Sequence, residues 1–573
     1  MLRNLRRGME LRVMPKLLNG VNCLRASPFQ IYQIVFWLTF FIGGMYFPWQ
    51  WGLVALVNLG ILVWQMIRTG KLWLPGGAVE FVCGGIIFAG AVINLFVCVD
   101  EGGGREGLLR LFVCLLFLIL LLQWTAEERL QLINMIPLAG AVMVVICAIG
   151  YGIPVIRPLV FTNERMAGCF QYANTFALFL LLGLIIDCNR GKIWWLIRIL
   201  LLAGIVASGS RWTMLLLLGW FLRKMVHREL NKSYLSLLLL AGGLLLIIAV
   251  AFRGWAFARF WESDAFSTVW GRLLYLQDAI SILADHPAGV GYLGWFYLQR
   301  TFQTGVYNVR FVHNEWVQIA LDYGIPAAAG AVVLVIYRLR KGCLAPALAV
   351  MICLHSMVDP DLQFYGMVTL LMLTLSPIKE CKIVISASIG KDLAVSSAAV
   401  ISVFAVSRGV ADLALQTGHL SLACNLVPYD TEAAVEQMLA RDTLIEATAD
   451  AHQLLSRNPY LSIAWQIVAE NALDRGEYEN MAIAQREAVK TQKYDQTVYD
   501  DALSRLTYAV EAGWSVDQAA DEMGWLVDYM DEVLEETSPL GWEIVDLPEL
   551  SFPVETRMQI RMLQQMAEFS EEE

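Results

Sequence analysis

Long apolar stretches dominate the first 415 residues, and polar positions gather in short segments between them. A helix that crosses a bilayer needs about 20 apolar residues, and thirteen stretches approach that length. The expected spans are 29–47, 49–67, 78–99, 107–124, 132–153, 169–187, 193–208, 212–226, 233–252, 316–337, 344–358, 363–378 and 394–415. The seventh and eighth are short, and Arg408 and Asp412 interrupt the last. The pattern predicts about 12–13 spans.

The basic residues between the spans predict their orientation, because short cytoplasmic loops carry an excess of Lys and Arg. Basic positions recur in alternate connections, at 68–71, 190–192, 223–232, 338–341 and 379–382. The flank 1–28 is also basic and lacks an apolar core followed by a cleavage site, so we expect it to be cytoplasmic. The long loop 253–312, between spans 9 and 10, then faces outward. Thirteen spans place residues 416–573 outside as well, whereas an even number would place them inside.

Composition divides the chain into two parts. Hydrophobic residues make up 57% and charged residues 16%, which departs from a soluble globular protein. The net charge of −10 combines a basic part, with 33 basic and 21 acidic residues up to position 415, and an acidic part, with 9 basic and 31 acidic residues beyond it. None of the 11 cysteines forms a CxxC pair, which favours buried free thiols over disulfides or a zinc site.

The acidic part, residues 416–573, is predicted to be a soluble helical domain. Residues 458–492 read as a helix, a turn at 475–477 and a second helix, opened by the Asn458-Pro459 pair. This resembles one tetratricopeptide unit, which has about 34 residues. Further helices are expected at 431–457, 496–512 and 515–537. A generic helical bundle is the alternative, and either arrangement would serve as an interaction surface.

Polar residues at the outward ends of the spans carry the candidate chemistry, because charge there is costly unless it has a purpose or a partner. The chain shows R-x-x-G-x-F-x-x-x-N from Arg165, then S-x-S-R ending at Arg211, G-R at Arg272, H-P-x-G-x-G from His286, and H-N-E-W from His313 followed by Y-G-I. In this order, over roughly residues 163–375, they resemble the O-antigen ligase and polymerase superfamily. Together with the apolar stretches, that resemblance predicts an all-α polytopic transmembrane bundle occupying 29–415.

The resemblance also implies a reaction. Members transfer a glycan from a polyprenyl (undecaprenyl) diphosphate carrier to an acceptor hydroxyl on the outer face of the bacterial cytoplasmic membrane. Arg211 and Arg272 match the diphosphate-binding arginines of the family, and guanidinium groups bind phosphate oxygens in a bidentate fork. Such a clamp can replace a metal, so we expect neither metal nor cofactor. The alternatives are an interfacial side chain for Arg211 and a solvated helix face for Arg272.

His313 matches the candidate base of the family. A neutral imidazole can take the proton of the acceptor hydroxyl as that oxygen attacks the anomeric carbon. The expected reaction is one displacement with inversion and without a covalent intermediate. The alternative is an interfacial packing residue. Asn314 and Glu315 complete the motif, and Arg310, one turn earlier, could contact substrate.

Four further residues are candidates for positioning the donor or acceptor. Arg165 and Asn174 could position the donor, although Arg165 could also pair with Glu164 or a surface carboxylate. His355 and Asp359 lie four apart, so we expect them on one helical face, with the Asp orienting the imidazole or with the pair capping the span.

A glycine motif at 289–294, GVGYLG, fits the dinucleotide fingerprint G-x-G-x-x-G. That fingerprint needs a strand before it, and here a helical pattern through residues 273–283 ends at His286-Pro287. We therefore expect a tight turn between two loop helices.

Two other functions remain open. Outward arginines could line the pathway of a secondary transporter for a polar or anionic solute, although the chain shows no matching halves. A non-catalytic scaffold of an envelope glycan complex could instead recruit a protein through residues 416–573. The motifs do not separate ligase from polymerase, nor a glycan, lipid, wall-polymer or protein acceptor.

Overall fold

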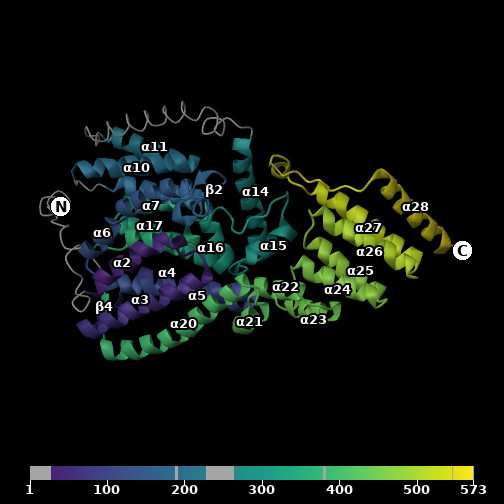
Figure 1. Cartoon of the computed structure of the whole chain (residues 1–573), viewed down its shortest axis with the longest axis horizontal. Coiled ribbons are helices and arrows are strands. Elements are labelled where there is room, and N and C mark those ends of the chain that lie inside the picture. Colours follow the sequence, from purple (N-terminus) through teal and green to yellow (C-terminus); the bar gives the residue numbers. More distant parts are fainter. Residues whose placement is uncertain (1–26, 187–190, 228–263, 379–381, 545, 572–573) are drawn as a thin grey trace.

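The computed structural model describes residues 27–186, 191–227, 264–378, 382–544 and 546–571. Most of this part of the chain is helical. A thick helical body and a narrower helical domain lie end to end, with the C-terminus at the far end of the narrower domain (Figure 1). The predicted span 233–252, residues 1–26 of the flank and the start of the loop 253–312 lie outside the described residues.

The body contains most of the apolar helices. We call the predicted long loop, residues 253–312, the outer loop. The helices before it are α2 (Pro28–Phe41), α3 (Pro48–Thr69), α4 (Ala78–Val97), α5 (Glu101–Leu122), α6 (Ala126–Ile133), α7 (Ile136–Tyr151), α8 (Arg157–Val160), α9 (Ala173–Ile185), α10 (Lys192–Ser208) and α11 (Arg211–Val226). The later ones are α14 (Asp264–Asp285), α15 (Gly294–Phe302), α16 (Glu315–Tyr323), α17 (Ile325–Lys341), α18 (Pro346–His355), α19 (Tyr365–Leu375) and α20 (Ala387–Gln416). Short 3-10 turns lie at Gly43–Met45, Gly168–Phe170 and Asp361–Gln363.

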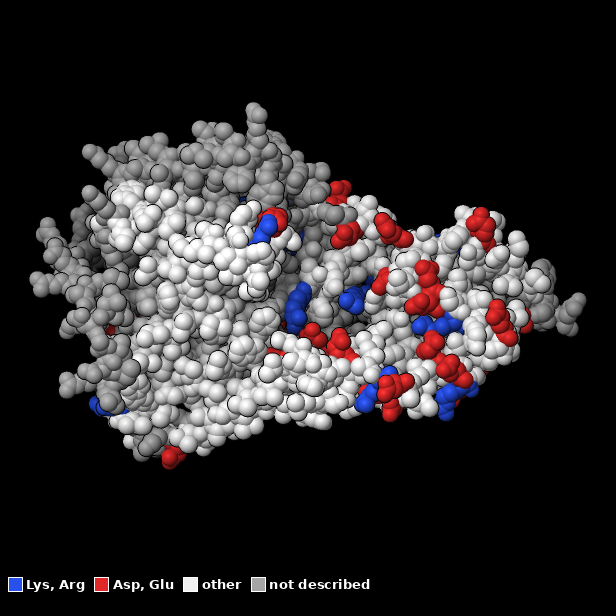
Figure 2. All heavy atoms as spheres, in the orientation of Figure 1, with Lys and Arg blue, Asp and Glu red and all other residues white. Residues whose placement is uncertain are grey.

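Within the described ranges, four helical segments are long and apolar enough to cross a membrane: Pro48–Thr69, Ala78–Val97, Ala126–Tyr151 and Val395–Gln416. Four shorter apolar helices accompany them: Ala173–Ile185, Ile193–Ser208, Pro346–His355 and Tyr365–Leu375. Each predicted span that falls on described residues contains at least one helix, and the number that crosses stays a prediction. On the face seen in Figure 2, charged side chains are sparse over the body and frequent over the C-terminal domain.

One predicted span is wrong, because it is two helices rather than one. The stretch 316–337 forms two helices, α16 and α17, which meet at Gly324. Gly324 has a φ of 93°, and a Cβ there would lie 2.8 Å from the carbonyl oxygen of Ala288. The chain needs glycine at this point because the turn after α14 packs directly against it. Pro326 then suits the start of α17 because it has no N–H to leave unpaired.

The last predicted span forms one helix despite its charges. Arg408 lies within α20 and is paired with Asp412, one turn away at 3.4 Å, and with Asp430 at the start of the C-terminal domain. These ion pairs compensate the charge at the end of an apolar helix. In Figure 1, α20 runs along the body from β4 to the C-terminal domain.

The described part of the body contains two short antiparallel sheets. Strand β1 (Lys71–Pro75) pairs with β4 (Lys382–Ser386), with Lys71 opposite Ser386. These strands follow two of the connections that were predicted to share one side of the membrane, so the pairing agrees with that grouping. Strand β2 (Phe161–Thr162) pairs with β3 (Arg165–Met166) at the site end of the body.

Helix α9 lies at the centre of the body. Its side chains from Ala173 to Leu184 are nearly all buried, except at Asn174, which is half-buried. A helix that is apolar on all faces must be surrounded by others, and α7, α10 and α18 pack around it. Its first turn is therefore held in place by the surrounding helices, and that turn carries Asn174, one of the candidate residues.

The C-terminal domain is a stack of antiparallel helices. They are α21 (Leu420–Leu426), α22 (Thr431–Leu439), α23 (Leu444–Leu455), α24 (Ser462–Asp474), α25 (Tyr478–Lys490), α26 (Gln496–Glu511), α27 (Val516–Glu535) and α28 (Val554–Glu571), with a 3-10 turn at Pro539–Trp542. The expected helix–turn–helix at 458–492 is present as α24 and α25. The single helix expected over 431–457 is wrong, because α22 ends at Leu439 and Thr443 caps a new helix. The tetratricopeptide resemblance stays a prediction.

The C-terminal domain is docked on the body through Asp100. This buried carboxylate caps α5 by accepting from Gly103 N at 2.7 Å, and its other oxygen accepts from Thr431 Oγ1 at 2.5 Å and Asn458 Nδ2 at 3.3 Å. A second contact joins Thr304 of the outer loop, whose carbonyl accepts from the amide of Ser538 at 2.9 Å. The domain therefore lies at the same end of the body as the outer loop.

Candidate functional site

Asp359 lies at the centre of a polar cluster at the outer-loop end of the body. Its Oδ1 accepts hydrogen bonds from Tyr172 Oη at 2.8 Å, Asn174 Nδ2 at 2.8 Å and Arg272 Nη2 at 3.0 Å. Three separate elements meet at this atom: the start of α9, the loop helix α14 and the turn after α18. Burial raises the pKa of the Asp359 carboxyl, but Arg272, His355, His313 and the hydrogen bond from Tyr172 together outweigh that effect and lower the pKa below its ordinary value. Asp359 is therefore a carboxylate at neutral pH.

Arg165 extends the cluster to the S-x-S-R turn. Its Nη2 donates to Asn174 Oδ1 at 2.6 Å, and its Nε donates to the carbonyl of Ser208 at 2.7 Å. The expected alternative, a pair with Glu164, is wrong, because Glu164 pairs with Arg157. Arg165 thus joins two of the motifs that carried the resemblance, as a group that orients Asn174.

Arg211 is the first residue of α11 and follows that turn directly. The next two residues contact the end of α18: Trp212 Nε1 donates to the carbonyl of Leu354 at 3.2 Å, and Thr213 Oγ1 lies 3.1 Å from His355 Nε2. The backbone of Arg211 is therefore fixed beside the cluster. Its side chain is half-exposed.

His313 lies in the segment between α15 and α16. Its ring centroid is 5.6 Å from that of Tyr275, which follows Arg272 by one turn on α14. Burial lowers the pKa of His313 to about 4; the negative charge of Asp359 opposes that shift and the positive charge of Arg272 adds to it. The imidazole is therefore neutral at pH 7, the form a general base requires.

The expected pairing of His355 with Asp359 is present only as a long contact, and the hydrogen-bond partner of the imidazole is another carboxylate. Helix α18 ends at His355, so the two residues do not share a helical face, and their closest side-chain atoms are 4.0 Å apart. Asp361 takes the expected place, with Oδ2 at 2.6 Å from His355 Nδ1. The 3-10 turn at Asp361–Gln363 folds the chain back toward the helix end, and Thr175 of α9 donates to the other Asp361 oxygen at 2.7 Å.

Asn314 and Glu315 hold the segment that carries His313. The Asn314 side chain caps α16 by accepting from the amides of Trp316 at 3.1 Å and Val317 at 3.2 Å. Glu315 is buried and accepts from Leu362 N at 2.9 Å and Gln363 Nε2 at 3.1 Å. Both residues therefore fix the position of His313 relative to the turn that carries Asp359.

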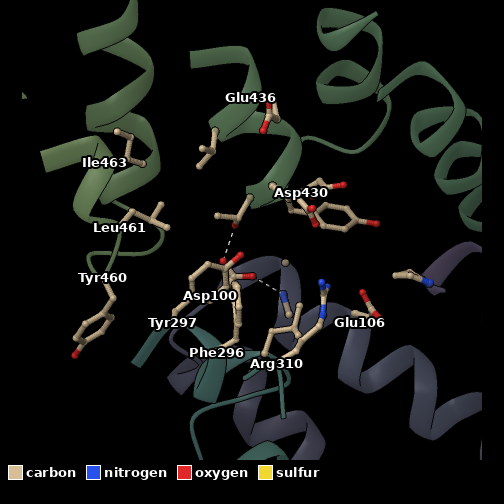
Figure 3. A pocket seen from close by; sticks show the side chains of 18 of the residues that line it. Asp100, Glu106, Phe296, Tyr297, Arg310, Asp430, Glu436, Tyr460, Leu461 and Ile463 are labelled. Carbon is tan, nitrogen blue, oxygen red and sulfur yellow. Dashed lines mark hydrogen bonds between the residues drawn. The ribbon is translucent and has the colours of Figure 1, made fainter. Parts of the chain in front are cut away.

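Arg310 does not join this cluster. It is exposed, its guanidinium lies 5.8 Å from the centroid of the Phe296 ring, and it lines a separate pocket next to the C-terminal domain (Figure 3). The sequence placed it with His313 because only three residues separate them.

The glycines of 289–294 form a tight turn between α14 and α15, as expected. Gly289 and Gly291 have φ values of 91° and 82°. A Cβ on Gly289 would lie 2.8 Å from the carbonyl oxygen of Leu321, and one on Gly291 would lie 2.5 Å from Cys98 Cβ. The motif therefore serves backbone packing of the outer loop against α16 and the end of α4.

Three buried polar atoms of the cluster make no hydrogen bond with the described part of the chain: Arg272 Nε, His313 Nδ1 and Asp359 Oδ2. Buried polar atoms are paired in the great majority of cases, so unpaired ones that gather in one place indicate where a ligand binds. Together they offer a donor on a permanent cation, a ring nitrogen and a carboxylate oxygen.

The sequence missed three residues of the cluster: Tyr172, Tyr275 and Asp361. Each lies within a segment selected for its charged or motif residues, two or three positions from a chosen residue. A buried tyrosine next to charged groups needs a partner for its hydroxyl, and that requirement was the available signal for Tyr172.

Among the described residues, no group of three or more His, Cys, Asp and Glu side chains has the arrangement of a metal site. The metal-independent reaction stays a prediction, because it depends on what the arginines bind.

Comparisons with known proteins give one match. No curated protein and no solved structure matches the chain. The family described as O-antigen ligase matches residues 196–332, from α10 to α17, a range that contains Arg211, Arg272, Arg310, His313, Asn314 and Glu315. This part of the chain is similar to O-antigen ligases, which supports the superfamily and suggests a membrane-bound glycan ligase or polymerase.

Proposed function

We propose that this protein transfers a glycan from a polyprenyl diphosphate carrier to an acceptor hydroxyl at the outer face of the bacterial cytoplasmic membrane. The observation that carries the proposal is a group of three atoms without a hydrogen-bond partner among the described residues: Arg272 Nε, His313 Nδ1 and Asp359 Oδ2. They lie at one end of a bundle of apolar helices. A lipid-linked diphosphate and a soluble sugar can meet only at such an end.

Arg272 is the proposed contact for the diphosphate. Its Nη2 is held by Asp359, so the guanidinium is fixed in orientation, while its Nε remains available to a phosphate oxygen. The side chain is 24% exposed, which leaves it open to a ligand. Arg211, at the start of α11, is the second proposed contact, and the two guanidinium groups would stabilise the charge that grows on the leaving diphosphate.

His313 is the proposed base. The acceptor oxygen forms a bond to the anomeric carbon while the bond from that carbon to the diphosphate oxygen breaks. The electron pair of the broken bond stays on the diphosphate, and the proton of the acceptor hydroxyl passes to the unpaired Nδ1 of His313. One such displacement inverts the anomeric centre and leaves no covalent intermediate.

The surface glycan of a deletion strain, with and without the restored protein, tests this proposal. A strain lacking the protein should lose a surface glycan, and wild-type protein should restore it, whereas His313→Ala should not. Normal glycan with His313→Ala at equal membrane level would refute the catalytic assignment. Single repeat units in place of long chains would identify a polymerase, and full-length polymer retained on its lipid carrier would identify a ligase.

A further inference from the structure

A pocket of about 460 Å³ lies between the body and the C-terminal domain (Figure 3). One wall comes from the first turn of α5, from α15 and from Arg310. The other comes from α22 and from the segment at Tyr460–Ile463 that begins α24. In Figure 3, Glu436 lies across the pocket from Phe296 and Arg310. The volume falls within the range of about 300–1,000 Å³ that is typical of sites for small ligands.

The two walls are held together by specific contacts, so the pocket has a defined shape. Asp100 at its base accepts from Thr431 and Asn458 of the C-terminal domain. Arg300 Nη1 donates to Gln492 Oε1 at 3.2 Å on another side. A Cβ on Gly102 would lie 2.2 Å from the carbonyl oxygen of Tyr429, so the α5 backbone and the C-terminal domain are in direct contact.

The lining combines aromatic faces with hydrogen-bonding groups. Five aromatic side chains contribute to it: Phe296, Tyr297, Phe404, Tyr429 and Tyr460. Between them, Glu432, Glu436 and Arg310 are exposed and make no side-chain hydrogen bond with the described residues. A sugar ring presents apolar C–H faces and an edge of hydroxyl groups, so it fits aromatic surfaces interleaved with carboxylates and a guanidinium.

The charge of the pocket lining favours the acceptor glycan over the diphosphate-linked donor as the ligand. Five carboxylates and three guanidinium groups line the pocket, but Glu106 is paired with Arg110 and Asp430 with Arg408. That leaves the carboxylates of Asp100, Glu432 and Glu436 against the guanidinium groups of Arg300 and Arg310. This excess of negative charge disfavours a diphosphate, which the proposed function assigns to Arg211 and Arg272. Hydroxyl groups, in contrast, can donate to free carboxylates.

The pocket is also close to the proposed base along the chain. Arg310 lines it, and His313 follows three residues later, a separation that an extended chain covers in at most about 10 Å. Between them Phe311 is buried against Tyr292, with ring centroids 5.9 Å apart, and this contact fixes the connecting segment. A glycan in the pocket could therefore extend one end toward His313.

We propose that this interdomain pocket binds the sugar residues of the acceptor glycan, with Phe296 as a stacking surface and Glu436 as a hydroxyl acceptor. The proposal rests on the proposed function, because it assigns the second substrate of that reaction. It gives the C-terminal domain a direct part in acceptor choice, since α22 supplies one wall.

Binding of a lipid-free oligosaccharide tests the pocket apart from the chemistry. The probe is the oligosaccharide released by mild acid from the surface glycan of the producing strain. Binding to the purified full-length protein in nanodiscs is measured by saturation-transfer NMR, with tryptophan fluorescence as the second signal. Wild-type protein and His313→Ala should bind alike, whereas Phe296→Ala and Glu436→Gln should each weaken binding by about tenfold or more.

Matched controls are Tyr508→Ala on α26 and Glu479→Gln on α25, both exposed and outside the pocket lining, which should bind as the wild type does. Unchanged binding in both pocket variants would overturn the pocket assignment, as would equal losses in the controls. Transfer by His313→Ala would instead overturn the proposed function and leave the binding result standing. Saturable binding of an unrelated peptide, in place of the oligosaccharide, would also overturn the proposal.

Discussion

Arg272 Nη2 lies 3.0 Å from Asp359 Oδ1, and this ion pair joins the outer-loop helix α14 to the turn that follows α18. Asp359 is 1% exposed and Arg272 is 24% exposed, so the carboxylate is hidden while the guanidinium keeps one open side. The carboxylate therefore orients the guanidinium, and Tyr172 and Asn174 hold the carboxylate in turn.

Asp359→Ala is expected to reduce transfer by about 10- to 100-fold, because it frees the guanidinium that contacts the donor. It also leaves Arg272 without its partner, and breaking a buried pair costs about 3 kcal/mol in the free energy of unfolding. Asp359→Asn should lose transfer with a smaller loss of stability, since an amide oxygen can still accept from Tyr172. Transfer rates and thermal midpoints in detergent measure the two effects.

The control for this ion pair is Asp285→Asn, an exposed carboxylate at the end of α14. This variant should change neither the transfer rate nor the thermal midpoint. Full transfer by Asp359→Ala would show that Arg272 needs no fixed orientation.

In the pH profile of kcat/KM, activity on the acid side, the acid limb, is expected to fall near pH 4 rather than near 6.5, because burial lowers the pKa of His313 to about 4. The base must be neutral, so activity falls as pH falls through that pKa. Arg272→Gln removes a charge that lowers the pKa and should move the limb to higher pH. Asp359→Asn removes a charge that raises the pKa and should move it to lower pH. Limbs that move in the same direction would contradict the assignment of His313 as the titrating group.

Arg211→Ala and Arg272→Ala are each expected to reduce kcat/KM for the lipid-linked donor by about 100-fold or more. The lysine variants should recover only part of this loss, because an ammonium group lacks the planar fork that binds two phosphate oxygens. Arg223→Ala is the matched control, since Arg223 is exposed in the last turn of the same helix as Arg211. Equal donor kinetics in Arg211→Ala and Arg223→Ala would remove Arg211 from the site.

The sequence predicted the helices, helix ends and turns that depend on residues close together in the chain. The end of α14 before His286-Pro287 was predicted because proline cannot continue a helix. The turn at 475–477 and the apolar helices followed from spacing alone. These features depend on residues near to one another in the chain.

Contacts between distant segments determined the features that the sequence did not predict. The break at Gly324 depends on the approach of Ala288, more than thirty residues away, inside an apolar run that reads as continuous. The choice of Asp361 over Asp359 as the partner of His355 depends on a 3-10 turn held by Thr175. The docking role of Asp100 likewise appears only once residues 431 and 458 are folded against it.

The predicted sidedness of the chain can be tested by labelling. An impermeant maleimide applied to spheroplasts should label Tyr508→Cys on the exposed face of α26, because the C-terminal domain is predicted to lie outside. Thr69→Cys, next to the exposed connection after α3, should be labelled only after the membrane is opened. Wild-type protein, whose own cysteines lie mostly in apolar segments, gives the background. The reverse pattern would invert the predicted topology.

Gly102→Ala is expected to separate the C-terminal domain from the body, and Gly103→Ala to displace the turn between α14 and α15 from α5. Their Cβ atoms would lie 2.2 Å from the carbonyl oxygen of Tyr429 and 1.9 Å from that of Tyr292. Alanine improves helix propensity by about 1 kcal/mol, so any loss of thermal stability must come from these contacts with other segments. Gly60→Ala is the control, because a Cβ at that position in α3 meets no atom of another described segment within 4 Å and should be neutral or stabilising. Hydrogen exchange in α22 should rise in Gly102→Ala and stay unchanged in Gly60→Ala, and equal exchange in the two would show that the backbone contact at Gly102 does not hold the domain.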